Sequence, residues 1–194
     1  GVTSGRLFFL ADYIQAGGVR PMKRAAFFVA ILTIVVSMRS DVFGQSGSWR
    51  TVRQLAAAEA VQAAAADQRF VYAIASRRVA KYDRKTGKRM ALSNGDARHL
   101  NSGFLWQGRL LCAHSNYPQT PEQSEIKVLD PETMELSTFR NFGNYGGSLV
   151  WVIRHQDHWW CNFARYGERN VETFLVRFDD DWNESGRWTY PKSV

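Results

Sequence analysis

Three stretches of the chain share one pattern: Val79–Lys88 (VAKYDRKTGK), Ile126–Glu135 (IKVLDPETME) and Leu175–Trp182 (LVRFDDDW). In each, an alternation of apolar and polar side chains runs to an Asp and continues into a polar turn. Alternation predicts a half-buried strand, and Asp and Gly suit the turn that joins two strands. The Asp residues are Asp83, Asp130 and Asp179, separated by 47 and 49 residues. The chain therefore contains a repeated strand-and-turn unit.

The segments upstream of these strands repeat as well. Phe104–Ala113 reads as strand, tight turn at Gln107-Gly108, and strand, and Leu149–Asn162 reads the same way around Gln156-Asp157. Cys112 and Cys161 each precede the Asp of their own unit by 18 residues, which sets the register of the two copies.

In that register the first copy has an innermost strand at Gln62–Ala66, a turn at Asp67-Gln68 and a second strand at Arg69–Ala73. Residue propensity disagrees, because Leu55–Ala66 is rich in Ala and Glu, which favour helix. We follow the repeat, since packing overrides propensity and small residues fit a crowded propeller axis. Residues 45–57 are expected to be a linker or a short helix.

Four short strands per unit, at a period of 40–50 residues, are typical of β-propeller blades. We therefore predict an all-β fold, a partial β-propeller of about three four-stranded antiparallel blades at residues 58–97, 98–143 and 144–194. Propellers typically close with four to eight blades. The expectation is that this chain is truncated and that the missing blades of the same full-length chain are its partners.

The N-terminal part precedes this domain. Met22-Lys23-Arg24 and the uncharged run Ala25–Met38 resemble the basic and apolar regions of a signal peptide. Residues 22–44 are thus predicted to form an apolar signal helix, with residues 1–21 a leader or an artefact. The prediction is a secreted or periplasmic protein that meets the membrane only through this segment; a short membrane anchor is the alternative.

Several segments also resemble known families. Tyr82–Lys88 (YDRKTGK) is similar to the strand-turn element of NHL, quinoprotein-type and related propellers. QAAAADQRFVYAI (62–74), HLNSG (99–103), CAHSNYP (112–118), GSLVWV (147–152) and LVRFDDDW (175–182) together resemble secreted bacterial propellers of unknown function, some named cycloisomerase-like. The resemblance implies the fold and almost no mechanism, and without a repeated tryptophan-docking motif it implies no quinone.

Composition narrows the function classes. The 194 residues are 45% hydrophobic and 22% charged, which excludes wholesale disorder. The net charge of +7 comes from scattered basic residues, so nucleic acid is not expected as a partner. The two cysteines, at equivalent positions of neighbouring blades, are expected to be buried and unpaired.

Blade topology places the candidate site residues at one end of the sheets, because two successive strands return the chain to the same end. The predicted catalytic residues are His99 and His114. The predicted ligand-binding residues are Asn101, Asn116, Tyr117, Tyr145, Arg165 and Tyr166. The tight turns with Asp83, Gly87, Gly108 and Glu132 fall at the opposite end.

Each candidate has a structural alternative. The two histidines suit a general base or, with Asn116 or a residue of the missing blades as third ligand, a divalent metal site; alternatively they hydrogen-bond backbone. The asparagines suit a sugar or carboxylate, or stabilise turns. The tyrosines suit a stacking rim, or seal the gap between blades.

The sequence thus favours an exported binding or scaffold propeller with a carbohydrate, peptide or protein ligand. The alternative is a propeller enzyme of lactonase, lyase or cycloisomerase type, with His99 or His114 as base and a divalent metal as candidate cofactor. The cofactor is otherwise undetermined.

Overall fold

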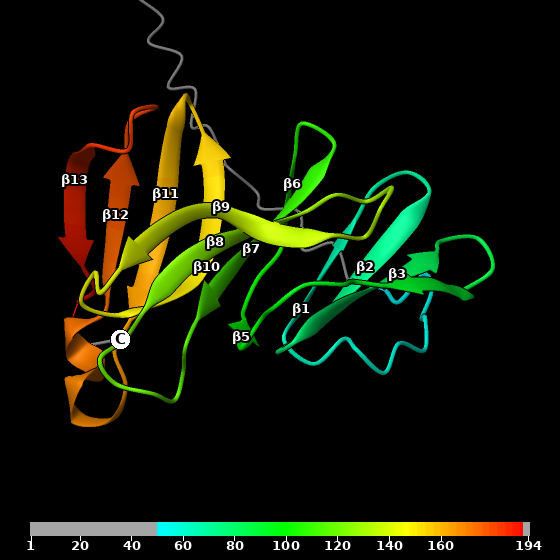
Figure 1. The fold of residues 1–194 in the computed structure, drawn as a ribbon, viewed down its shortest axis with the longest axis horizontal. Coiled ribbons are helices and arrows are strands. Elements are labelled where there is room, and N and C mark those ends of the chain that lie inside the picture. The colour runs from blue at the N-terminus through cyan, green and yellow to red at the C-terminus, as the bar shows by residue number, and fades with distance from the viewer. Residues whose placement is uncertain (1–49, 192–194) are drawn as a thin grey trace, which may run out of the picture. The chain divides into compact units, whose positions relative to one another are not determined.

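The computed structural model describes residues 50–191, which form three antiparallel sheets (Figure 1). The first contains β1 (Ala63–Ala66), β2 (Phe70–Ala75), β3 (Arg78–Asp83) and β4 (Arg89–Leu92). The second contains β5 (His99–Leu100), β6 (Phe104–Trp106), β7 (Arg109–Ser115), β8 (Ser124–Leu129) and β9 (Leu136–Gly143). The third contains β10 (Ser148–His155), β11 (His158–Ala164), β12 (Phe174–Phe178) and β13 (Glu184–Thr189), with the 3₁₀ helix η1 (Gly167–Glu172) between β11 and β12.

In the first and third sheets the strands follow one another in chain order, as the blade pattern predicts; in the second, β5 and β6 both pair with β7, which is followed by β8 and β9. The predicted fold class, about three four-stranded antiparallel blades, is confirmed. Residues 22–44, the predicted signal segment, and residues 1–21, the predicted leader or artefact, lie outside the described residues. Among residues 50–191, no helix is both long and apolar enough to cross a membrane.

Strand pairing confirms the repeat register residue by residue. The residue three positions before each turn Asp is Ala80, Lys127 or Val176. Its partners on the neighbouring strand are Ala73, Cys112 and Cys161, respectively. Cys112 and Cys161 are buried and free, as predicted, and they belong to two different core clusters.

The Ala-rich segment forms a strand, as the repeat predicts and propensity does not. β1 pairs with β2 from Ala63 to Ala66, and residues 50–57 form neither helix nor strand. Instead, the segment 53–59, which we name the N-terminal strap, lies against the first sheet. The Arg53 guanidinium donates to the backbone oxygens of Arg84 and Lys85.

The innermost strand of the second sheet is interrupted. β5 pairs with the end of β7, and β6 pairs with its beginning. The gap between them contains Gly103, where an added Cβ would lie 2.4 Å from Cδ1 of Ile74 in the first sheet. The interruption lets the backbone approach the neighbouring sheet more closely than any side chain allows.

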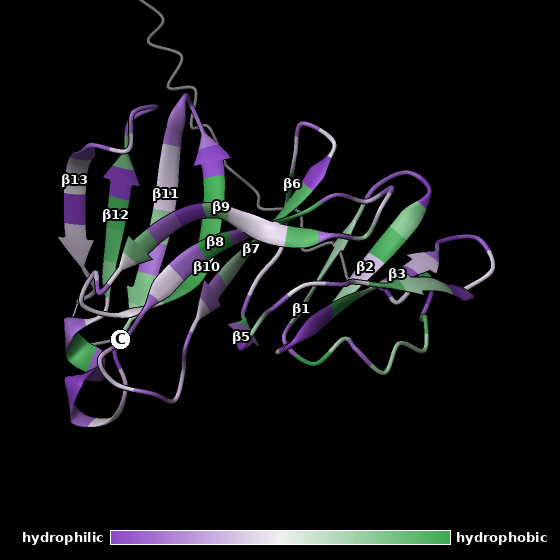
Figure 2. Cartoon of the chain, viewed as in Figure 1, coloured by the Kyte–Doolittle hydropathy of each residue, from purple (hydrophilic) through white to green (hydrophobic). Residues whose placement is uncertain are grey.

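Side chains from both faces of the second sheet build the core. One cluster joins Tyr72, Ile74 and Val79 of the first sheet to Leu110 and Cys112 of the second. A larger cluster joins the second and third sheets; its buried members are Leu111, Ala113, Ile126, Val128, Leu149, Val152, Trp159, Cys161, Phe163, Phe174, Val176 and Phe178. Figure 2 shows hydrophobic segments on β2 and β10 and hydrophilic turns.

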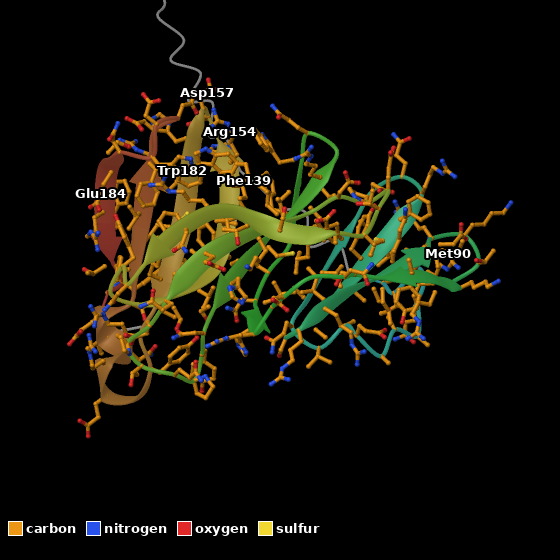
Figure 3. All side chains as sticks on the ribbon, viewed as in Figure 1. Met90, Phe139, Arg154, Asp157, Trp182 and Glu184 are labelled. Atoms are coloured by element: carbon orange, nitrogen blue, oxygen red, sulfur yellow. The ribbon has the colours of Figure 1, made fainter. Side chains whose placement is uncertain are left out.

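The two ends of the sheets differ as the strand parity predicts. Turns from the first two sheets meet at one end, where Asp67, Gly108 and Glu132 line the same hollow. In the third sheet, the β10–β11 turn with Asp157 lies at the end opposite η1 (Figures 1 and 3). At that end the Arg154 guanidinium pairs with Asp180 at 2.6 Å. This ion pair connects the end of β10 to the β12–β13 turn. The loops with the candidate residues lie at the other end.

Candidate functional site

An aromatic series runs across the loops at this end. The rings of His99 and Tyr117 have centroids 5.1 Å apart, and those of Tyr117 and Tyr166 are 4.7 Å apart. Tyr117 and Tyr166 are 40% and 45% exposed, so both side chains remain partly accessible to solvent. The loop after β7 and the loop after β11 therefore meet through two tyrosines.

These rings border a hollow of about 240 Å³, which we name the tyrosine hollow. Its lining residues are Tyr117, Pro118, Gln119, Thr120, Glu122, Ser148, Arg165, Tyr166 and Arg169. Two guanidinium groups contribute positive charge, and Glu172 balances it in part, lying 3.5 Å from Arg165 Nε and 3.2 Å from Arg169 Nε. Burial raises the pKa of Tyr166, so its hydroxyl stays protonated at neutral pH.

Asn116 holds the loop between β7 and β8. Its Oδ1 accepts a hydrogen bond from the backbone N–H of Gln123 at 2.9 Å, and its Nδ2 donates to the backbone oxygen of Pro121 at 3.0 Å. Both ends of the amide are used, which is the turn-stabilising alternative for this residue. In this arrangement Asn116 shapes the site, and its amide keeps one N–H and one oxygen lone pair beyond these two bonds.

Asn101 and Tyr145 also have structural partners. The Asn101 amide donates to the backbone oxygen of Leu149 at 2.9 Å, which fastens the second sheet to the third. The Tyr145 ring packs on Phe163 with centroids 4.7 Å apart, and its hydroxyl donates to Glu184 at 2.6 Å. Tyr145 therefore seals the core, and its ring does not join the series of exposed rings.

A second, larger hollow of about 590 Å³ lies beside the first, and we name it the polar cleft. Its lining residues are Asp96, Ala97, Arg98, His114, Asn116, Gln123, Glu125, Lys127 and Asn141. They come from the segment before β5 and from β7, β8, β9 and the β7–β8 loop. That loop borders both hollows.

His114 has a defined tautomer in the cleft. The backbone N–H of Arg98 donates to His114 Nε2 at 2.9 Å, so Nε2 has no lone pair for a metal or a proton. Burial and the charge of Lys127 lower the His114 pKa to about 4, so the ring is neutral at neutral pH and its proton sits on Nδ1. His114 matches the alternative of a backbone-bonded histidine, and of the two predicted bases only His99 has a ring without such a bond among the described contacts.

A charged cluster surrounds His114. The Glu125 carboxylate accepts hydrogen bonds from Asn141 Nδ2 at 3.1 Å and pairs with Lys127 Nζ at 2.8 Å. Lys127 Nζ also donates to Thr138 Oγ1 at 2.9 Å. Lys127 is 9% exposed, and such a buried cation is tolerated only when it is paired.

The sequence analysis missed Glu125, Lys127 and Asn141. Lys127 occupies the position of Ala80 in the first sheet and Val176 in the third, where the repeat calls for an apolar residue. The signal in the sequence is this single charged residue at a position that is apolar in the other two copies of the repeat.

Among residues 50–191, no group of three or more His, Cys, Asp and Glu side chains is arranged to hold a metal ion.

Comparison with known proteins concerns the fold alone. No family model matches the sequence, and no curated protein matches it. Among solved structures, hydrazine synthase of Kuenenia stuttgartiensis aligns with a TM-score of 0.50 at 13% identity, over 66% of this chain and 36% of that one. The chain has a propeller-like fold.

Two other solved structures align less closely. Dihydro-heme d1 dehydrogenase NirN gives a TM-score of 0.46 at 17% identity, over 73% of this chain and 30% of that one. The computationally designed protein Ika8 gives 0.45 at 10% identity, over 66% of this chain and 36% of that one. This chain spans about a third of the length of each of these three proteins.

Proposed function

We propose that the chain is part of an exported propeller-like binding protein that holds a carbohydrate at the tyrosine hollow. The observation that carries the proposal is the pair of exposed, touching rings of Tyr117 and Tyr166 beside Arg165. Aromatic rings present an apolar face with a polar tip, which suits the apolar faces and hydroxyl groups of sugars. Function of this kind resides on loops that a rigid scaffold positions.

The site's charges favour a sugar over a peptide. The hollow combines two guanidinium groups with the carboxylate of Glu122, the hydroxyls of Thr120 and Ser148, and the amide of Gln119. Such a mixture of donors and acceptors fits many hydroxyl groups.

Titration of the exported protein with oligosaccharides tests the proposal. The probes are neutral gluco- and manno-hexasaccharides and a hexamer of galacturonic acid. Isothermal titration calorimetry measures the affinity for each. Tyr117→Ala and Tyr166→Ala are expected to weaken binding about tenfold or more, because each removes a stacking face.

Tyr190→Ala is the matched control, since Tyr190 is similarly exposed, at 46%, but lies outside the hollow. Binding that survives both hollow variants, or no binding of any of the three oligosaccharides, would overturn the proposal.

The enzymatic alternative keeps one candidate base. The His99 ring touches Tyr117 at the margin of the hollow, while His114 Nε2 is occupied by a backbone donor. Turnover of a bound oligosaccharide that His99→Gln abolishes while binding persists would favour a lyase or isomerase over a binding domain.

We also propose that a further sheet of the same kind packs on the outer face of the third sheet. Trp160 and Leu175 of the third sheet have equivalents in the other two. These are Tyr72 and Val79 in the first sheet, and Leu111 and Ile126 in the second. All four are buried by the next sheet. The missing blades of a longer chain are the natural source of that sheet.

A further inference from the structure

The polar cleft departs from the repeat at several neighbouring positions. On the face that meets the preceding sheet, the second sheet has His114, Glu125 and Lys127 where the third sheet has Phe163, Phe174 and Val176. The three residues of the third sheet are buried in the core. A sequence that gives up apolar packing at three adjacent positions of one copy marks a functional site.

One atom of this cluster has no partner. His114 lines the cleft and is 7% exposed, and its protonated Nδ1 is itself buried without a hydrogen bond among the described residues. The nearest carboxylate oxygen, Oε2 of Glu125, is 3.3 Å away but outside hydrogen-bonding geometry. An unpaired buried donor is costly, so packing alone does not explain why this copy of the repeat has a histidine here.

The groups around Nδ1 define what fits. The cleft holds two carboxylates, Asp96 and Glu125, and two cations, Arg98 and Lys127, beside the neutral His114. A ligand with a net charge would unbalance these pairs, whereas hydroxyl groups both donate and accept.

We propose that the polar cleft binds a single neutral polyhydroxyl unit, a monosaccharide or the terminal unit of a longer sugar. One hydroxyl donates to the Glu125 carboxylate beside His114, and a neighbouring hydroxyl accepts from Lys127 Nζ. The ligand class rests on the proposed function. The β7–β8 loop, whose Asn116 borders the cleft and whose Tyr117 borders the tyrosine hollow, connects the two.

Nuclear magnetic resonance of the exported protein tests this inference with neutral hexoses, myo-inositol and galacturonic acid as probes. A neutral hexose or inositol is expected to bind and to shift the Nδ1–H signal of His114. Galacturonic acid is expected to bind at least tenfold more weakly, because its charge unbalances the pairing of two carboxylates with two cations in the cleft.

The triple variant H114F/E125F/K127V installs the residues of the third sheet and is expected to abolish hexose binding. Its fold is checked by circular dichroism, and K127M and E125Q serve as milder variants should the triple variant fail to fold. Each of these is expected to weaken binding tenfold or more. Tyr190→Ala, outside both hollows, is the control and is expected to retain monosaccharide binding, and Y117A/Y166A reports whether the sugar sits in the tyrosine hollow instead.

The outcomes separate the two proposals. If wild-type protein binds none of the neutral probes at tens of millimolar, or if K127M and E125Q bind them as wild type does, the cleft proposal is overturned while the tyrosine hollow stands. If Y117A/Y166A loses monosaccharide binding and K127M keeps it, the sugar occupies the tyrosine hollow alone, and the cleft proposal falls as well.

Discussion

Gly103 shows how one residue sets the spacing between sheets. A Cβ there would lie 2.4 Å from Ile74 Cδ1 and 3.2 Å from Leu110 Cδ1, and both side chains are fully buried. The core around it has no room to relax, since close-packed interiors transmit strain rather than absorb it.

Gly103→Ala is therefore expected to lower the free energy of unfolding by about 1–3 kcal/mol, the usual cost of overpacking. Chemical denaturation measures it. Ser102→Ala is the adjacent control and is expected to be nearly neutral, because the buried Ser102 hydroxyl has no hydrogen-bond partner among the described residues. Equal stability of G103A and wild type would show that the two sheets are not packed as described.

His114 shows how burial fixes a protonation state. Its pKa is lowered to about 4 chiefly by burial, so the folded protein releases this proton well below the ordinary value of 6.5. The unfolded chain binds the proton first as the pH falls. The stability that depends on neutral His114 is thus complete above about pH 6.5 and is lost as the pH falls towards 4.

Nitrogen-edited magnetic resonance of the four histidines checks this. The His114 ring is expected to remain the Nδ1–H tautomer between pH 5 and 8 and to titrate only near pH 4. A midpoint above pH 6 would mean that Nε2 does not accept the Arg98 N–H.

At the scale of the element, the N-terminal strap acts as a cover for the first sheet. Ala57 packs beside Ala73, Ala80 and Tyr82. Glu59, which is 6% exposed, accepts hydrogen bonds from the Tyr82 hydroxyl at 2.5 Å and from the Arg89 guanidinium at 2.7 Å. The hydrogen bond from Tyr82 is the main cause that lowers the Glu59 pKa.

Because the folded-state pKa of Glu59 is lowered, its contribution to stability is present above about pH 4.5 and is lost as the pH falls further. Glu59→Gln is expected to cost about 1–2 kcal/mol at pH 7. The difference in unfolding free energy between E59Q and wild type should become smaller below pH 4. Urea denaturation from pH 3 to 7 measures both curves, and a gap that is constant with pH would contradict the ion pair.

Elements with a repeated pattern could be predicted from the sequence. The strands ending at Asp83, Asp130 and Asp179 follow from alternation and turn chemistry, and each Asp accepts backbone N–H groups of its own turn. The division of the second sheet's inner strand into β5 and β6 did not follow, since it depends on contact with Ile74, 29 positions earlier.

The candidate site could also be predicted only in part, because a side chain's role depends on partners that are distant in sequence. Loop position and residue type placed Tyr117, Tyr166, Arg165 and His99 at one end. Whether an Asn or His binds a ligand or its own backbone depends on partners that no local pattern contains, as with His114 and the N–H of Arg98.

At the scale of the molecule, the outer face of the third sheet is incompletely covered. Trp188 is 44% exposed and stacks on Trp160 with centroids 5.4 Å apart, and Ile153 is 38% exposed. Arg177 lies over both tryptophan rings. Large exposed apolar faces promote association.

The 194-residue chain is therefore expected to associate at high concentration through this face. The double variant I153S/W188S is expected to reduce association measured by sedimentation velocity, and Val171→Ser, at an exposed position on η1, is the control. Association that the double variant leaves unchanged would place the contact elsewhere.

The N-terminal strap also bears on the order in which the chain folds. Each sheet is an up-and-down meander of local pairings, so it forms without waiting for distant sequence. The strap supplies the first sheet with a packing partner before the second sheet has been synthesised. Each later sheet then docks on a finished surface, so folding can proceed in step with emergence of the chain, from its N-terminal side onward.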